Sequence, residues 1–235
     1  NVLVGGIFKD VLDFDPSSGT TNLDANTNGT AFLAKYTANK QLLWAFNFGK
    51  SGIAATDNIV QGITVDNNND IYIAGFVQSA NNIDFDPSSN TVNLVPNGPY
   101  DGFVAKYTSA GAYVFAFLIG GAGVDVFNDI ASDNSGNIYV TGYANATSLD
   151  LDPSSSTATA TAQGGGENIM LASYSSTGQY RWGKLIGNSG ADHGRRLTVS
   201  GNSVLVTGWF SNTVDFNQGG SSSANQSSNG NTDIF

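Results

Sequence analysis

The feature that most constrains this chain is an internal repeat. The segment LDFDPSS at residues 12–18 recurs in closely related form at 83–89 and 149–155, and a degenerate copy follows at 214–217. The first aspartates of the four copies are residues 13, 84, 150 and 215, so the copies are spaced by 71, 66 and 65 residues. Self-similarity at such a period is typical of arrays in which one supersecondary unit is stacked repeatedly.

Further sequence markers recur with the same spacing. An apolar run is found at residues 32–37, 103–108 and, more loosely, 170–175, and a second run ending in Gly is found at 70–75, 137–142 and 203–208. Trp44, Phe115 and Trp182 each precede a glycine by five positions. Because the markers keep one order, they predict repeat units over 1–61, 62–128, 129–195 and 196–235, with the first and last incomplete.

Each complete unit contains four short runs rich in Val, Ile, Tyr and Phe. In the second unit these runs cover residues 62–66, 71–77, 102–108 and 113–119, and Gly, Asn and Asp bound them. Such runs are typical of β-strands, and the short connections at 67–70 and 109–111 are typical of tight hairpins. No segment shows a 3.6-residue apolar stripe, so we expect almost no helix.

Four antiparallel strands per unit, repeated in tandem, predict an all-β fold of the β-propeller type. The run at 114–119 is apolar on both faces, as expected for a sheet packed between two neighbours. A string of β-sandwich modules is the alternative, although sandwich domains usually need about 100 residues. Roughly three and a half units cannot close a ring of 4–8 blades. We therefore expect the remaining blades to come from the rest of a longer chain or from another subunit.

The charge balance excludes several partners. The net charge is −10, which repels phosphate backbones and anionic lipid, so we expect no nucleic-acid binding. No apolar run approaches the ~18 residues of a membrane span, so we expect no membrane insertion. The chain has no Cys, which excludes disulfides and thiolate metal sites.

The repeated Asp-x-Asp-Pro-Ser segments are the main candidate sites. Alternate side chains of an extended strand share one face and lie about 7 Å apart. Two carboxylates with Ser and carbonyl oxygens could hold Ca²⁺, the only cofactor that the sequence indicates. The candidate ligands are Asp13, Asp15, Ser17, Asp84, Asp86, Ser88, Asp150, Asp152 and Ser154. The alternative is a purely structural turn capped by these side chains. The fourth copy, with Asn217 and no Pro, should bind calcium less well or not at all.

Other polar residues are weaker candidates. Asp57, Asp125 and Asp192 follow the Gly-rich bend after the fourth strand, where a tight turn is favoured over a ligand-facing position on one rim. His193 is the only histidine and no G-x-S-x-G motif is present, so a surface histidine without a catalytic role is favoured. Aromatic residues at repeat positions, such as Trp44, are typical of a core, although exposed ones could stack on sugars.

The repeat resembles a known family. The segments 101–107, 120–125 and 136–142, with Gly111 and Asp133, are similar to the bacterial β-propeller repeat called SBBP. The inserted Asp-Phe-Asp-Pro stretch resembles a variant common in large surface and secreted proteins of Bacteroidota. This resemblance implies a propeller, an extracellular or cell-surface location and, in many members, type IX secretion. The chain departs from the pattern where Thr30 and Asn168 replace the acid found at Asp101.

Three classes of function follow from these patterns. The favoured class is a non-catalytic, extracellular or cell-surface module for adhesion or structural scaffolding, with other surface proteins or glycans as partners. The alternative is a glycan- or protein-binding propeller with a defined rim pocket. A propeller hydrolase or lyase is the least favoured, because the acids Asp13, Asp84 and Asp150 would have to converge on the central channel.

Overall fold

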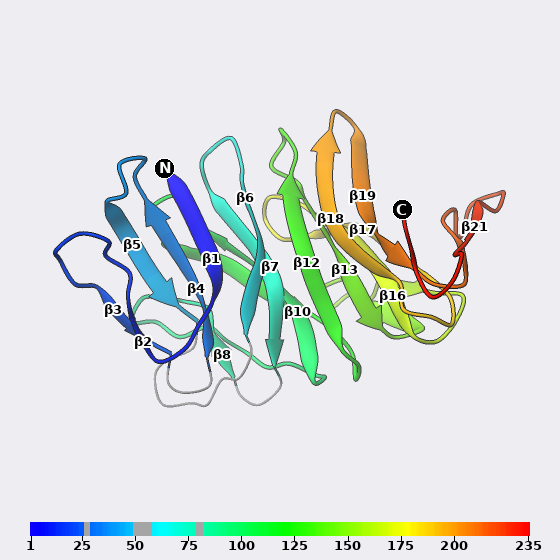
Figure 1. Cartoon of the computed structure of the whole chain (residues 1–235), viewed down its shortest axis with the longest axis horizontal. Coiled ribbons are helices and arrows are strands. Elements are labelled where there is room, and N and C mark those ends of the chain that lie inside the picture. Colours follow the sequence, from blue (N-terminus) through cyan, green and yellow to red (C-terminus); the bar gives the residue numbers. More distant parts are fainter. Residues whose placement is uncertain (26–28, 49–57, 79–81) are drawn as a thin grey trace.

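The computed structural model describes residues 1–25, 29–48, 58–78 and 82–235. All regular elements in these ranges are β-strands, which confirms the all-β prediction. Four sheets follow one another in chain order from one end of the molecule to the other (Figure 1). No helix that could span a membrane occurs in the described ranges.

The two middle sheets have the predicted four antiparallel strands in chain order. Sheet 2 consists of β6 (Ile59–Val65), β7 (Ile71–Gln78), β10 (Tyr100–Tyr107) and β11 (Tyr113–Ile119). Sheet 3 consists of β12 (Asp125–Ser132), β13 (Ile138–Asn145), β16 (Glu167–Tyr174) and β17 (Tyr180–Ile186). In both sheets the first strand pairs only with the second and the fourth only with the third, which is the up-and-down arrangement of a propeller blade.

The first strand of sheet 2 begins three residues earlier than the sequence pattern predicts. The pairing of β6 with β7 shifts between Val60 and Gly62, so Gln61 is the extra residue of a β-bulge. The equivalent first strands β12 and β18 carry the same bulge at Asn128 and Arg195. The extra residue interrupts the alternation of apolar side chains, and this interruption concealed the start of the strand.

The outer sheets contain subsets of the same four strands. Sheet 1 consists of β1 (Val2–Phe8), β4 (Thr30–Tyr36) and β5 (Leu42–Asn47), which correspond in register to the second, third and fourth strands of sheet 2. Sheet 4 consists of β18 (His193–Ser200), β19 (Ser203–Phe210) and the short β22 (Asp233–Ile234), which correspond to the first, second and third strands.

A small hairpin is inserted between the second and third strands of every sheet. The four hairpins are β2–β3 (Val11–Asp13, Asn22–Asp24), β8–β9 (Ile83–Asp84, Asn93–Leu94), β14–β15 (Ser148–Asp150, Thr159–Thr161) and β20–β21 (Thr213–Asp215, Asn225–Ser227). The apolar residue between the two aspartates is buried, with Phe85 1% exposed and Leu151 fully buried. A tyrosine hydroxyl of the same sheet donates to the backbone carbonyl of this residue and holds the hairpin in place.

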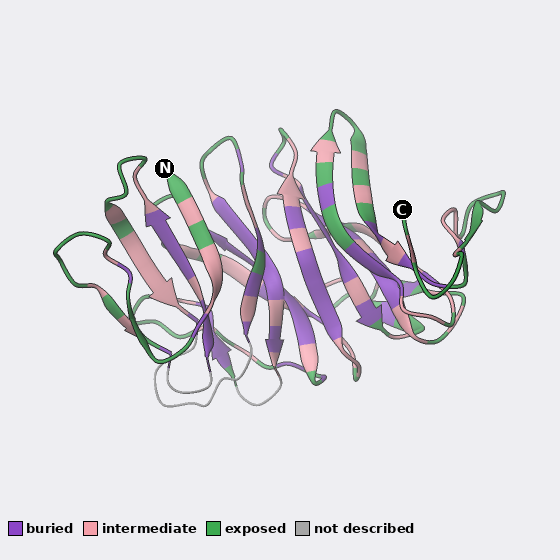
Figure 2. Cartoon of the chain, in the orientation of Figure 1, coloured by how far each residue is buried: buried purple, intermediate pink, exposed green. Residues whose placement is uncertain are grey.

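Neighbouring sheets share their hydrophobic cores, so the units are not separate sandwich modules. One core joins sheets 1 and 2 and another joins sheets 2 and 3, and β12 lies against both β6 and β18. The consecutive residues Tyr72 and Ile73 point to opposite faces of β7, and both are fully buried. The second and third strands of the middle sheets are accordingly buried along most of their length (Figure 2). This stack of two four-stranded sheets between two three-stranded ones is a propeller-like β fold.

Candidate functional site

The side chains of the Asp-x-Asp loops bind the backbone of their own turns. Asp13 Oδ1 accepts hydrogen bonds from the amides of Asp15 (3.0 Å) and Thr21 (2.8 Å). Asp15 Oδ1 accepts from the Ser17 amide (2.9 Å), and Ser17 Oγ accepts from the Gly19 amide (3.0 Å). The hydrogen bonds from Ser17 lower the pKa of Asp15, so its carboxylate is ionised near neutral pH.

The same contacts recur in the other loops. Asp84 accepts from the amides of residues 86 and 92, and Asp150 accepts from those of residues 152 and 158. The degenerate fourth copy keeps these contacts: Asp215 accepts from the amides of residues 217 and 224. In the described ranges, no three His, Cys, Asp or Glu side chains group as a metal site. The contacts explain the repeated motif as a turn, and calcium at these loops stays a prediction.

The loops lie on the outside of the stack. Asp86 and Asp152 line hollows against β5 and β11, the fourth strands of the preceding sheets. The first strands, β6, β12 and β18, lie beside one another on the opposite side of the sheets. The hydrolase alternative required the repeated carboxylates to converge on a central channel. They lie instead on the side of the sheets away from the neighbouring first strands.

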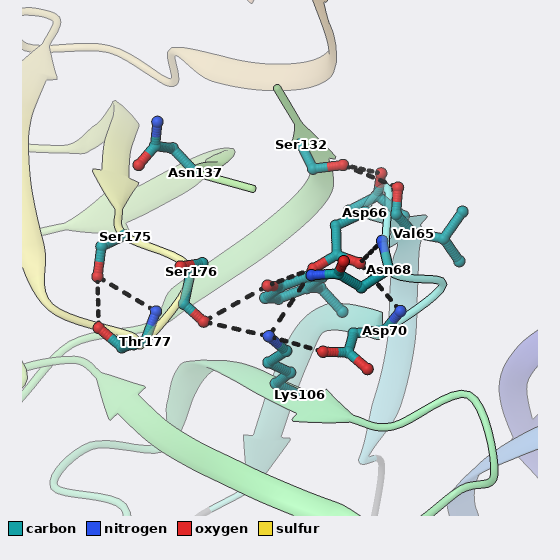
Figure 3. Close-up of polar contacts among 12 residues, drawn as sticks. Val65, Asp66, Asn68, Asp70, Lys106, Ser132, Asn137, Ser175, Ser176 and Thr177 are labelled. Carbon is teal, nitrogen blue, oxygen red and sulfur yellow. Dashed lines mark hydrogen bonds and ion pairs between the residues drawn. The ribbon is translucent and has the colours of Figure 1, made fainter. Parts of the chain in front are cut away.

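A buried lysine connects sheet 2 to sheet 3 (Figure 3). Lys106 of β10 is only 8% exposed, and its Nζ lies 3.0 Å from Asp70 Oδ2. The same Nζ donates to the carbonyl of Ser176 (3.3 Å), which lies in the outer hairpin of sheet 3, the turn between its third and fourth strands. Tyr72 donates to Asp66 Oδ2 (3.1 Å), and its ring lies 4.8 Å from Lys106 Nζ. Burial lowers the pKa of Lys106, but the contacts with Tyr72 and Asp70 outweigh this effect and raise it overall.

Equivalent cations are found in the sheets on either side. Lys35 of sheet 1 donates to the Ser109 carbonyl in the outer hairpin of sheet 2 (2.5 Å). In sheet 3 the equivalent of Lys106 is Ser173, but Arg181 of the neighbouring strand donates to Ser173 Oγ (2.8 Å) and to the hydroxyl of Tyr139 (3.2 Å). Lys35 and Lys106 therefore connect neighbouring sheets, whereas the contacts of Arg181 lie within sheet 3. The repeated Ala-Lys-Tyr sequence was the signal that could have identified two of them.

The aspartates of the second set are buried turn residues. Asp125 and Asp192 are fully buried, and Asp57 lies outside the described residues. Asp192 accepts from the amides of Asn188 (3.0 Å) and Ser211 (2.8 Å), and Asp125 accepts from the Gly121 amide (2.7 Å). Burial raises the pKa of Asp125 to about 6. The turn interpretation therefore holds for Asp125 and Asp192, neither of which faces solvent.

The interpretation of His193 as a surface residue is wrong. The imidazole is stacked between Tyr143 (centroids 3.9 Å apart) and Trp209 (4.7 Å), and the residue is only 9% exposed. Its Nε2 lies 2.7 Å from an oxygen of Glu167, and the Arg195 guanidinium covers the ring of Trp209 at 4.8 Å. The packing of β18 against sheet 3 creates this cluster. Its sequence signal was that the only His and the only Glu occur in one unit.

Surface grooves lie where neighbouring sheets meet. The groove between sheets 1 and 2 has a volume of about 490 Å³, and the groove between sheets 2 and 3 has a volume of about 480 Å³. Each is lined by an outer strand, by the Asp-Pro-Ser loop of the next sheet and by the outer hairpin turn of that sheet. Sequence reasoning assigned repeat-position aromatics such as Trp44 to the core. Trp44, Phe46 and Phe115 are partly buried and pack against the core, and Phe117 is buried in it.

Comparisons with known proteins agree with this architecture. The family model described as the SBBP β-propeller repeat matches residues 115–150, which run from β11 to β14. An uncharacterized WD repeat-containing protein of Acanthamoeba polyphaga mimivirus, L264, is 26% identical over 243 residues, covering 91% of this chain. The aligned region spans only 17% of that relative's length. The family resemblance seen in the sequence is confirmed over the matched residues.

Proposed function

We propose that this chain, part of which matches the SBBP β-propeller repeat, is a non-catalytic scaffold segment of an extracellular surface protein. The observation that carries the proposal is a pair of open sheet faces. Sheets 1 and 4 present the same surfaces that are buried between the inner sheets, so each of them can bind a further blade.

The openness of these end faces is seen by comparing the exposed fractions of residues at equivalent strand positions. Val2 pairs with Tyr36 as Ile71 pairs with Tyr107, yet Val2 is 51% exposed and Ile71 only 1% exposed. On sheet 4, Leu205 is 58% exposed and its equivalent Tyr72 is fully buried. Exposed apolar sheet faces of this kind are typical of interaction surfaces. The open face of sheet 1 corresponds to the Ile71 face of sheet 2, and the open face of sheet 4 corresponds to its Tyr72 face. These two faces differ, and each junction between inner sheets joins one of them to the other.

Other observations support a scaffold at the cell surface. The net charge of −10 and the Asp-, Asn- and Ser-rich turns suit a soluble repeat that avoids phosphate and lipid partners. The acids with repeated positions bind backbone amides, which is a structural task. The resemblance to repeats of surface and secreted proteins supports the extracellular location. Adhesion to surface proteins or glycans is the role that such an array would serve, with calcium in the inserted loops as a further prediction.

Sedimentation velocity tests the docking faces directly. We expect the chain to associate head to tail as its concentration rises, and Val4→Asp, at a position 40% exposed on the open face of sheet 1, to weaken this association at least tenfold. Val95→Asp is the matched control, because Val95 is 64% exposed in a loop outside the sheets. A chain that stays monomeric at millimolar concentration, with an unchanged circular dichroism spectrum, would refute the docking role.

The extracellular setting needs a separate test. An antibody against the chain should label intact cells that produce the natural protein. Labelling that requires permeabilised cells would exclude the surface location and leave the scaffold architecture unaffected.

A further inference from the structure

Two Asn-Gly pairs occupy equivalent positions in the repeat. The pair at residues 97–98 precedes β10, the third strand of sheet 2, and the pair at residues 229–230 precedes β22, the third strand of sheet 4. In each turn an aspartate four residues after the Asn accepts a hydrogen bond from the Asn amide, at 2.8 Å in sheet 2 and 2.9 Å in sheet 4. The two turns therefore share one sequence feature and one backbone contact.

The surroundings of the two glycines are opposite. Gly98 is buried, and its N–H donates to Asp101 Oδ1 at 3.0 Å. A Cβ at Gly98 would collide with the carbonyl oxygens of Gly121 and Gly123, which belong to the connection between sheets 2 and 3. Gly230 is exposed, and nothing lies within 4 Å of the corresponding position. Within the described part of the chain its N–H donates no hydrogen bond.

From this contrast we propose that Asn229 is a site of covalent self-modification, in which the peptide nitrogen of Gly230 attacks the side-chain amide carbon of Asn229. An N–C bond forms and closes a five-membered imide. The proton of the Gly230 N–H is lost to solvent, and the side-chain nitrogen takes up a proton and leaves as ammonia. One water molecule then opens the imide at either of its two carbonyls, which leaves aspartate or isoaspartate at position 229.

The turn in sheet 4 meets the requirements of this reaction. The attacking group is a backbone nitrogen, which must be accessible to the base that removes its proton. The missing side chain leaves the approach open, and the φ of 122° at Gly230 is one that glycine adopts without strain. The Asn229 side chain is exposed and makes no hydrogen bond to the described residues, so it is free to rotate towards the nitrogen. Because the two groups are adjacent in the chain, the step is intramolecular.

The turn in sheet 2 blocks the same reaction. Removal of the Gly98 proton would break its buried hydrogen bond to Asp101, and breaking such a bond is costly. The connection at 121–123 also covers Gly98, which leaves no room for the solvent base or for the attack. Asn97 therefore serves as an internal control with an identical dipeptide.

The modification would alter the turn that leads into β22. It adds one negative charge to a chain whose net charge is already −10, at a residue whose amide is bonded to Asp233. Isoaspartate also lengthens the backbone by one methylene group. Both changes act close to β22, which Phe235 joins to Gly208 by two backbone hydrogen bonds of 3.1 and 3.3 Å.

A blade docked on sheet 4 would protect the site. Its connection would cover Gly230 as the 121–123 connection covers Gly98. The modification would then mark arrays whose sheet 4 is uncovered. This consequence rests on the docking role proposed above, whereas the reaction at Asn229 does not.

Peptide mapping by mass spectrometry tests the proposal on the folded protein, held in neutral buffer at physiological temperature and sampled over several weeks. We expect aspartate and isoaspartate to accumulate at residue 229 at least tenfold faster than at residue 97. Gly230→Ala places a methyl group on the attacking residue and should slow the conversion at least fivefold. Gly165→Ala is the matched control, because Gly165 is the exposed glycine at the equivalent position of sheet 3 and should have no effect. In urea the two Asn-Gly pairs should convert at similar rates.

Every other outcome overturns the proposal. Equal rates at residues 97 and 229 in the folded protein would show that the surroundings do not control the reaction, and a tenfold difference that persists in urea would assign it to the neighbouring sequence. Aspartate without isoaspartate would indicate direct hydrolysis, and an unchanged rate in Gly230→Ala would exclude attack by that nitrogen. None of these results bears on association through the open end faces, which sedimentation measures separately.

Discussion

The tyrosine that holds each inserted hairpin allows a sharp test of the structure. Tyr107 is fully buried, and its hydroxyl donates to the Phe85 carbonyl at 2.8 Å. Tyr107→Phe removes only the hydroxyl and keeps the ring, which lies 5.1 Å from Phe46. The variant therefore leaves a buried carbonyl without this donor and creates no large cavity.

The expected magnitude follows from the burial. A net hydrogen bond contributes about 1 kcal/mol, and a buried group left unpaired costs about 1–3 kcal/mol. We expect Tyr107→Phe to lower the free energy of unfolding by about 1.5–2 kcal/mol, which corresponds to about 3–8 °C in Tm for a chain of this size. Urea unfolding followed by circular dichroism measures the change, with an unaltered m value showing that the unfolding transition is otherwise the same.

The repeat supplies two matched variants. Tyr174→Phe removes an equally buried contact to Leu151 (3.1 Å) and should have the same effect. Tyr36→Phe removes the contact to Phe14 (3.0 Å) on the open face of sheet 1, where Tyr36 is only half-buried, so we expect a loss below about 1 kcal/mol. Equal losses of unfolding free energy in all three variants would show that the open face of sheet 1 is covered. An unchanged unfolding free energy in Tyr107→Phe would refute the contact that holds the inserted hairpin.

Three further predictions address other parts of the fold. Burial raises the pKa of Asp125 from 3.8 to about 6, so the folded state favours its protonated form. The free energy of unfolding should therefore fall by about 2–3 kcal/mol as pH rises from 4 to 7. Asp125→Asn should reduce this pH dependence, as measured by urea unfolding at each pH. Gly142→Ala places a Cβ against the Val126 carbonyl and should cost about 3 kcal/mol or more by thermal unfolding, whereas Gly165→Ala, with open space, should be near neutral. Calcium in the inserted loops, at 100-fold above its Kd, would add about 2.7 kcal/mol; equal Tm values in Ca²⁺ and EDTA would leave only the turn interpretation.

Local pattern predicted most of the architecture. The strand starts at Ile71 and Tyr113 agree with the sequence pattern, because alternating apolar residues and the turns that bound them are local features. The strand beginning at Ile59 was placed too late, because the bulge at Gln61 breaks the alternation. The candidate site was predicted less well. The Asp-x-Asp loops were identified, but nothing in their spacing showed that they would lie beside the outer strand of the preceding sheet.

The sequence by itself determined the repeat unit, its four strands and its turn-forming aspartates, since each depends on residues close together in the chain. Tertiary structure decided which surfaces are covered. Val2 and Ile71 are similar residues at equivalent strand positions, and only the presence of a neighbouring sheet makes one exposed and the other buried. The pairing of His193 with Glu167 joins sheet 4 to sheet 3, and the surface grooves form where neighbouring sheets meet. Stacking of the sheets brings together side chains that are far apart in the sequence, and a local sequence pattern does not show which of them will meet.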